Sequence, residues 1–404
     1  MRTPTIHIRP GHPDFLDLDW TAPIGVWDGG RLVDMPTGIH RHPVVFVAYN
    51  EGVYAIKELP LPVARHEFEA LRTLEERTTR TARAVGLIER GWWDDHDEGA
   101  GVVITQFAEY AFPYRELVSG AGFGRHRGRL LDAFAGLLVE LHLAGAYWGD
   151  CSLSNILYRW DGASIETVMV DAETAELHEV LSTGQRRQDL AIMEENVAGE
   201  MADIAAAHGF DLDSADLALG AEITERYAAL WKELRADPVI AQNESYLIRE
   251  RIARMNDLGF SVEDVELIPV DGGNKVRMQL TVGGRTYHSE RLRSLIGVEA
   301  SENQARFILS DLTYHEHKFG GDSPTGKAVA AMRWRATVLE PILATISSEL
   351  PQDDPLQRYT DFLNHRYRLA TKRGQDIPND EAYADWRSAS YPGHAPESAE
   401  TGGS

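Results

Sequence analysis

One short segment constrains this chain more than any other: residues 147–160, with the sequence YWGDCSLSNILYRW. It holds a carboxylate, Asp150, and five residues later an amide, Asn155, which is followed at once by an apolar, strand-like run. A turn at residues 161–162 leads into a second strand-like run, IETVMV, which ends just before Asp171. A loop followed by a hairpin of this kind delivers three polar side chains to one place.

The residues before this segment predict a small sheet with one helix. We expect two strands in residues 44–59 around a turn at 50–52, and a helix in residues 63–77, where apolar side chains recur at three-residue steps. The runs RAVGLIERGWW and GVVITQFAEY predict two more strands. After them, RGRLLDAFAGLLVELHLAG predicts an amphipathic helix that ends at Gly145.

The residues after the segment predict helices and then a third section. Residues 186 to about 235 are expected to be mostly helical. From residue 244 the sequence predicts one helix, then strands in VEDVELIPV, NKVRMQLTV and RTYHSERL, and finally helices at 301–318, about 326–349 and 355–372.

The composition excludes several classes of protein. With 404 residues, 43% of them hydrophobic, the chain is long enough for two or three domains with real cores. A net charge of -23 argues against a general binder of nucleic acid or of anionic membranes, because both are negative. The single cysteine, Cys151, suits a reducing compartment. The N-terminal residues are not typical of a signal peptide, and no apolar run reaches the roughly 18 residues that a membrane span needs, so we expect a cytoplasmic protein.

Five side chains stand in the order that phosphoryl transfer from ATP requires. Lys57 ends a predicted strand and would hold the phosphates, and Glu67 in the next helix would hold the lysine. Asp150 would orient the attacking hydroxyl, while Asn155 and Asp171 would hold Mg²⁺. The sequence therefore predicts Asp150, Lys57 and Glu67 as catalytic residues.

Each of these side chains also has a purely structural interpretation. Lys57 by itself would be a surface lysine at the end of a strand. Glu67 and Glu69 could both belong to a solvated helix face, and Asp150 with Asn155 could form only a turn. The order of the five side chains along the chain favours the functional interpretation.

The same residues carry a resemblance to the protein-kinase-like superfamily. VYAIK is similar to the V-A-I-K strand, GDCSLSN to the H-R-D-x-x-x-x-N loop with a changed start, and VDAE stands where D-F-G would be. The pattern G-D-x-x-x-x-N is shared with the aminoglycoside and lipopolysaccharide (Kdo or heptose) kinase branches. More narrowly, WGDCSLSN, DAET and GQRRQDL…NVAGE resemble an actinobacterial family with a lipopolysaccharide-kinase-like front and a C-terminal domain of unknown function.

The resemblance implies an α+β fold: a bilobal protein-kinase-like structure, with a small antiparallel sheet lobe and a helical lobe, followed by a mixed α/β C-terminal domain. It also implies ATP in the cleft and a hinge around residues 106–108. The nucleotide-binding residues expected on this basis are Lys57, Gln106, Ala108, Asn155 and Asp171. The expected divisions are an irregular lead-in (1–34), an N-lobe (35–108), a C-lobe (109–240), an accessory domain of unknown function (244–385) and a disordered tail (386–404).

Three departures from the family's motifs leave a pseudokinase open as the alternative. No G-x-G-x-x-G precedes Lys57, where the sequence offers only PTGIHRH. Trp148 replaces the usual histidine of the loop, and Ala172-Glu173 replaces the Phe-Gly of the metal motif. The carboxylate of Glu173 is predicted as a supplementary metal ligand, and a solvent-facing acid is the alternative.

The expected function is an ATP- and Mg²⁺-dependent phosphotransferase that acts on a hydroxyl of a small molecule or glycan. Only 18 residues separate Asp171 from Asp189, and no A-P-E follows, which leaves little room for a segment that docks a peptide. The predicted metal ligands are Asn155, Asp171 and Glu173. The alternative is a nucleotide-binding pseudokinase whose residues 244–385 bind a protein partner; the sequence leaves the acceptor open.

Overall fold

The chain divides into two compact units, Met1–Arg159 with Glu166–Glu233 and Trp160–Ile165 with Leu234–Ser404. The finer domain boundaries given above stay predictions. The computed structural model describes residues 4–35, 42–77, 80–90, 100–116, 124, 126–209, 211, 213–241, 244, 246–270, 275–319 and 324–393.

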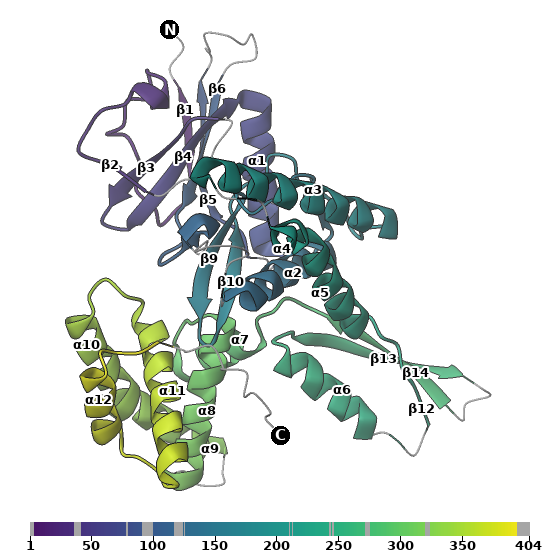
Figure 1. The fold of residues 1–404 in the computed structure, drawn as a ribbon, viewed down its shortest axis with the longest axis vertical. Helices are drawn as coiled ribbons and strands as arrows, with labels where there is room; N and C mark the ends of the chain where they lie inside the picture. The colour runs from purple at the N-terminus through teal and green to yellow at the C-terminus, as the bar shows by residue number, and fades with distance from the viewer. Residues whose placement is uncertain are drawn as a thin grey trace. The chain divides into compact units, whose positions relative to one another are not determined.

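The first unit begins with a six-stranded antiparallel sheet in the order β1-β5-β6-β4-β3-β2 (Figure 1). Helix α1 packs against this sheet on β5 and β6. The strands and the helix are β1 (Thr5–Ile8), β2 (Leu32–Val33), β3 (Val44–Tyr49), β4 (Gly52–Pro60), β5 (Arg83–Arg90), β6 (Ala100–Gln106) and α1 (Leu61–Glu76). The predicted strand, strand, helix, strand, strand order is present in β3 to β6.

The lead-in over residues 1–34 was predicted to be irregular, and this is wrong. It supplies β1, β2 and a 3-10 turn, η1 (Ile24–Val26). Its buried side chains join the core of the sheet: Phe15, Trp20 and Ile24. The many Pro, Gly and Asp residues between its apolar positions hid this packing, because local sequence reports turns more readily than contacts with distant strands.

The alternating side chains of β4 show which residues lie on each face of the sheet. Successive side chains of a strand point to opposite faces. Tyr54 and Ile56 belong to the core that contains the lead-in. Glu58 continues that face, where it pairs with the buried Arg90 and accepts the backbone N–H of Ile24. The opposite face therefore carries Lys57.

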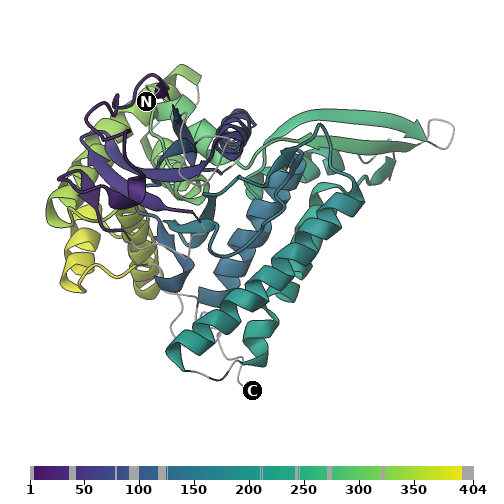
Figure 2. The same cartoon turned by 90° about the horizontal axis from the view of Figure 1, so that it is seen from above.

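Helices make up most of the rest of the first unit (Figures 1 and 2). The helices α2, α3 and α5 contact one another through His142, Asp189, Glu194 and Thr224. The elements are β7 (Phe112–Pro113), η2 (Tyr114–Glu116), α2 (Arg127–Leu143), β8 (Ala146–Tyr147), β9 (Ile156–Asp161), β10 (Ser164–Met169), β11 (Glu176–Leu177), α3 (Thr183–His208), α4 (Ser214–Leu217) and α5 (Leu219–Leu234). A capping box of Ser182 and Gln185 fixes the start of α3.

The second unit combines a three-stranded sheet, in the order β12-β14-β13, with helices. Its elements are β12 (Val239–Ala241), α6 (Tyr246–Asp257), β13 (Val262–Val270), β14 (Lys275–Val282), α7 (Tyr287–Ile296), α8 (Glu302–Phe319), α9 (Pro324–Trp334), a π-helical turn (Arg335–Leu339), α10 (Glu340–Glu349), α11 (Pro355–Arg373) and α12 (Asn379–Ser388). The α+β fold class predicted from the sequence is confirmed.

Two predictions in this unit are wrong. The run RTYHSERL was predicted as a strand, but it forms the start of α7, because Leu292 and Ile296 lie four residues apart and both are buried. The tail was predicted to be disordered from residue 386, yet Trp386 is fully buried in α12 and helps to form the core. Residues 394–404 of the predicted tail lie outside the described residues. No helix in the described part of the chain is long and apolar enough to cross a membrane.

Candidate functional site

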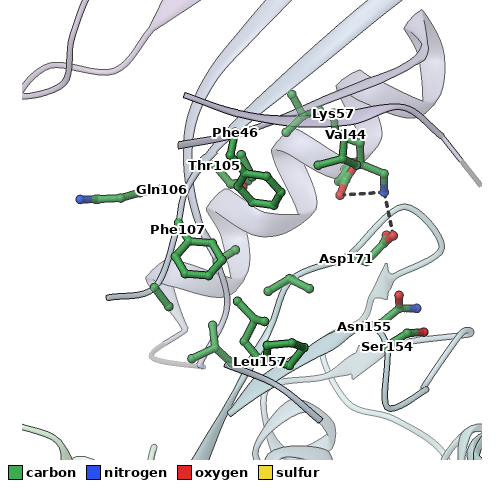
Figure 3. A pocket seen from close by; sticks show the side chains of 18 of the residues that line it. Val44, Phe46, Lys57, Thr105, Gln106, Phe107, Ser154, Asn155, Leu157 and Asp171 are labelled. Atoms are coloured by element: carbon green, nitrogen blue, oxygen red, sulfur yellow. Dashed lines mark hydrogen bonds and ion pairs between the residues drawn. The ribbon is translucent and has the colours of Figure 1, made fainter. Parts of the chain in front are cut away.

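Three carboxylates surround the ammonium group of Lys57. Figure 3 shows Lys57 with Asp171, one of the three. Its Nζ lies 2.7 Å from Asp171 Oδ2, 3.4 Å from Glu67 Oε1 and 3.2 Å from Glu173 Oε2. The structure thus brings together a lysine from β4, a glutamate from α1 and two acids from the segment after β10. Glu69, the alternative partner on α1, is exposed and pairs with Arg72 instead.

Helix α1 is held to the segment that follows Asp171, and this fixes the direction of Glu67. His66 Nε2 donates to Ala175 O at 2.8 Å, and Arg77 Nη1 donates to His178 O at 3.0 Å. Both bonds come from the same helix, about three turns apart. Glu67 lies between them and is buried against the sheet.

The excess of negative charge shows in the pKa values of the cluster. Burial alone would lower the pKa of Lys57, but the carboxylates around it, Glu67 foremost, hold it above its usual value. Burial raises the pKa of Glu67 to about 8, and the negative charges of Asp171 and Glu173 add to this, although Lys57 opposes it. One ammonium group therefore does not neutralise the site, and a further cation would be stabilised there.

The loop after β8 places Asp150 and Asn155 together. Asn155 Nδ2 donates to the backbone O of Asp150 at 3.0 Å and to its Oδ2 at 3.3 Å. The backbone N–H of Val170 donates to Asn155 O at 3.0 Å, which ties this loop to the end of β10, next to Asp171. The hairpin predicted from the sequence thus brings Asn155 and Asp171 to one site.

An apolar pocket opens beside Lys57 (Figure 3). Its polar end contains Lys57, Glu67, Asn155 and Asp171, and the two hinge residues predicted from the resemblance, Gln106 and Ala108, line it as well. Its apolar walls come mainly from β3, β4, β6, β9 and β10: Val44, Phe46, Ala55, Val103, Leu157, Val168 and Val170. Asp150 and Glu173 are not among the described residues that line the pocket.

Trp148, which replaces the loop histidine of the motif, is a buried structural residue. It is 1% exposed, and its Nε1 donates to Asp171 O at 2.9 Å. The residue that holds this segment, Asp189, was not predicted as a site residue. Asp189 of α3 is fully buried and accepts the backbone N–H groups of Trp148 and Gly149, each at 2.7 Å. A charged residue inside a long helix was the available signal, since such residues are rarely buried without partners.

Residue His42 lies next to the place where a glycine-rich loop would stand, before β3. Its Nε2 is 3.9 Å from Glu173 Oε2. The predicted replacement for the glycine motif, PTGIHRH, has its residues 36–41 outside the described part of the chain.

The residues fit a divalent cation, although no group of three or more His, Cys, Asp or Glu side chains among those described is arranged as a complete metal site. Among the described residues, no hydrogen-bond partner is found for the buried Oε2 atoms of Glu67 and Glu173, although Glu173 Oε2 forms an ion pair with Lys57. Such oxygen atoms, together with the surplus of negative charge, suit a hard cation such as Mg²⁺, which takes few protein ligands and completes its shell with phosphate and water.

Two family models match separate parts of the chain. Residues 49–210, which contain every predicted site residue, match the lipopolysaccharide kinase (Kdo/WaaP) family. Residues 229–390 match a domain of unknown function, DUF4032. The chain joins a lipopolysaccharide-kinase-like region to a DUF4032 domain. The resemblance inferred from the motifs is thereby confirmed, and with it the kinase-like character of the first unit.

Among solved structures, the chain is similar to one titled "WaaP in complex with acyl carrier protein". The two are 18% identical with a TM-score of 0.34, over 57% of this chain and 89% of that one. No curated protein matches the sequence.

Proposed function

We propose that this protein is an ATP- and Mg²⁺-dependent phosphotransferase that acts on a hydroxyl of a small molecule or glycan. The observation that carries the proposal is the position of Lys57, which pairs with Glu67 and Asp171 at the polar end of an apolar pocket. This is the arrangement that a kinase uses to hold phosphates next to a metal-binding carboxylate. The match to a lipopolysaccharide kinase family supports a kinase-type reaction.

The apolar walls and the polar end of the pocket would bind different parts of the nucleotide. The flat, apolar base would lie between the side chains of β3, β4 and β9, and the hinge backbone at Gln106 and Ala108 would bind its polar edge. The N–H of Phe107 already donates to Val53 O at 2.9 Å, so the hinge keeps its shape without a ligand. Lys57 would bind the phosphates, and Glu67 would hold the lysine in place.

The loop supplies the group that handles the acceptor. In the proposed reaction the acceptor oxygen attacks the terminal phosphorus of ATP, ADP leaves, and the hydroxyl proton passes to the Asp150 carboxylate. Asn155, Asp171 and Glu173 would hold Mg²⁺. When bound, this ion would neutralise charge on the phosphates.

The acceptor class follows from the short connection between the metal segment and α3. Helix α3 begins at Thr183, and the segment between it and Asp171 contains only the two-residue strand β11. Little chain is left to bind an extended peptide. A compact hydroxyl compound or a sugar needs no such platform.

Three measurements test the proposal. Mg²⁺-ATP should raise the thermal midpoint of the protein, because a ligand that binds the folded state stabilises it, and Lys57→Ala should reduce this shift.

A metabolite library with γ-labelled ATP should yield a phosphorylated acceptor, and Asp150→Asn should abolish this transfer while ATP still binds. ATP binding without any turnover would instead establish the pseudokinase, and no binding at millimolar nucleotide would overturn both hypotheses.

A further inference from the structure

The loop that carries Asp150 is bound along one face of α3. Three polar side chains of this helix contact it: Asp189, Asn196 and Glu200. They are separated by seven and four residues, a spacing that places them on the same side of a helix. Each one binds a different part of the loop, so α3 holds the whole segment in place.

Asn196 contacts the carboxylate of Asp150 directly. Its Nδ2 donates to Asp150 Oδ1 at 3.0 Å and to the backbone O of Cys151 at 3.1 Å. Both hydrogens of the amide are used in this way. The second carboxylate oxygen, Oδ2, accepts the longer 3.3 Å hydrogen bond from Asn155 Nδ2. The amide of Asn196 therefore sets the plane of the Asp150 carboxylate.

Glu200 fixes the middle of the same loop. Its two carboxylate oxygens accept the backbone N–H groups of Leu153 and Ser154, each at 2.8 Å. Burial raises the pKa of Glu200, and these two hydrogen bonds work against that rise. The two hydrogen bonds offset the free-energy cost of burying the Glu200 carboxylate, and they hold the loop backbone in place.

We propose that Asn196 is a positioning residue for phosphoryl transfer, which orients the Asp150 carboxylate toward the acceptor hydroxyl. This rests on the proposed function. The helix face, with Glu200 beside Asn196, does what a longer activation segment does in other kinases: it holds the catalytic loop in one conformation.

The size of the effect follows from the geometry. A displacement of about 1 Å in a reacting group costs about a hundredfold in rate. Asn196→Leu removes both donors but keeps the branching at Cγ, and should lower kcat by about this factor. The ATP affinity should stay within about twofold, because Asn196 is not among the described residues that line the pocket.

Conservative and control variants separate hydrogen bonding from packing. Asn196→His keeps an N–H donor close to the position of Nδ2 and should retain most of the activity that Asn196→Leu loses. Glu195→Gln, on the adjacent and exposed position of α3, should behave like the wild type. A loss of activity that is equal in the Leu and His variants would show that the site is sensitive to packing, and would overturn the proposal.

The decisive experiment is a double-mutant cycle with Asp150→Glu, which keeps a carboxylate and should reduce the rate without abolishing it. The probe is Mg²⁺-ATP: its binding is measured by calorimetry, and its turnover as phosphate released to water or to an acceptor found in the library screen. If Asn196 acts through Asp150, then Asn196→Leu should cause a much smaller further loss of rate in the Asp150→Glu background than in the wild type. Independent, multiplying losses would overturn the inference.

These outcomes are distinct from failure of the proposed function. A wild-type protein that binds ATP but never turns it over removes the proposed reaction, and the positioning role with it. An active wild type with a fully active Asn196→Leu variant removes the positioning role alone. If the leucine variant does not fold, the same cycle with Asn196→Ser, which is smaller and keeps one donor, decides the question in the same way.

Discussion

The most informative residue of the molecule is Lys57, because its surroundings separate two interpretations that its sequence left open. A surface lysine at the end of a strand would have water around it. This one instead has Glu67, Asp171 and Glu173 within 3.4 Å and is mostly buried. Three acids around one base leave negative charge uncompensated, and two testable consequences follow at the scale of single residues.

The first consequence is a pH dependence of stability that originates at Glu67. Its pKa is raised from the ordinary 4.5 to about 8 in the folded protein. Between these two pH values the folded chain binds more protons at this group than the unfolded chain does. The free energy of unfolding therefore falls as the pH rises through this window, and the contribution is lost above pH 8.

Glu67→Gln should remove that dependence. Thermal midpoints measured from pH 5 to 9, without nucleotide or divalent metal, should fall more steeply with pH for the wild type than for the variant. Glu69→Gln is the matched control, because this neighbour is exposed on the same helix and should leave the wild-type slope unchanged. Parallel curves for the wild type and Glu67→Gln would contradict the assignment.

The second consequence concerns Glu173 as a metal ligand. Its Oε2 is buried and lies 3.2 Å from Lys57 Nζ, so the side chain points toward Lys57 and not into the solvent. Glu173→Gln keeps the shape but removes the charge. The Mg²⁺ concentration that gives half-maximal turnover at saturating ATP should rise by about tenfold or more.

Exposed Glu176 provides the control for this measurement. It lies on β11 of the same segment, and Glu176→Gln should leave the Mg²⁺ requirement unchanged. If Glu173 is only a counterion for Lys57, its variant will change the affinity for ATP and not the requirement for metal. That result would remove Glu173 from the metal site and leave Asn155 and Asp171 in place.

At the scale of elements, the sequence predicted what is local and missed what is distant. Strands β3 to β6, helix α1 and the hairpin β9–β10 have their own periodicity, and the polar residues of the site follow them at fixed spacings. Asn196 could not be found in this way, because its partner Asp150 is 46 residues away in the chain and an asparagine inside a helix has no distinct pattern. The lead-in was missed for the same reason.

The lead-in gives an energetic prediction at this scale. The ion pair of Glu58 and Arg90 is fully buried and also binds the backbone of the lead-in at Ile24 and Ala22. Removal of one partner leaves a buried charge without compensation, so Glu58→Leu should lower the free energy of unfolding by about 3–5 kcal/mol. Denaturant unfolding of the whole chain, followed at the first transition, measures this loss.

A second ion pair, between α1 and β5, is the natural comparison. Arg65 and Glu89 are bidentate at 2.7 Å, but Arg65 is largely exposed. Arg65→Met should lower the free energy of unfolding far less than Glu58→Leu does, because solvent screens the exposed pair. Equal losses for the exposed and buried pairs would show that the lead-in is not fastened to the sheet by Glu58 and Arg90.

At the scale of the whole molecule, the chain passes between the two units more than once. Residues Trp160–Ile165 belong to the second unit, although they form the turn between two strands of the first. The same hairpin therefore carries Asn155 at one end and a buried carboxylate, Asp161, at the other. The turn at residues 161–162 could be predicted from the sequence alone. That this turn belongs to the second unit could not.

Asp161 accepts three hydrogen bonds at the start of α8, from Asn303 N at 3.0 Å, Asn303 Nδ2 at 2.9 Å and Gln304 N at 2.7 Å. It thus satisfies helix N–H groups that would otherwise be buried without partners. Asp161→Ala should destabilise the second unit by about 2 kcal/mol or more.

Hydrogen exchange locates this loss within the molecule. Peptides from α8 and from the β9–β10 hairpin should exchange faster in Asp161→Ala, whereas peptides from α1 and β4 should be unchanged, since these lie in the other compact unit. Asp257→Ala, at the exposed end of α6, should leave every peptide as in the wild type. If α1 and β4 exchanged as fast as α8, the two units would unfold together, and the DUF4032 domain would be part of the stability of the candidate site itself.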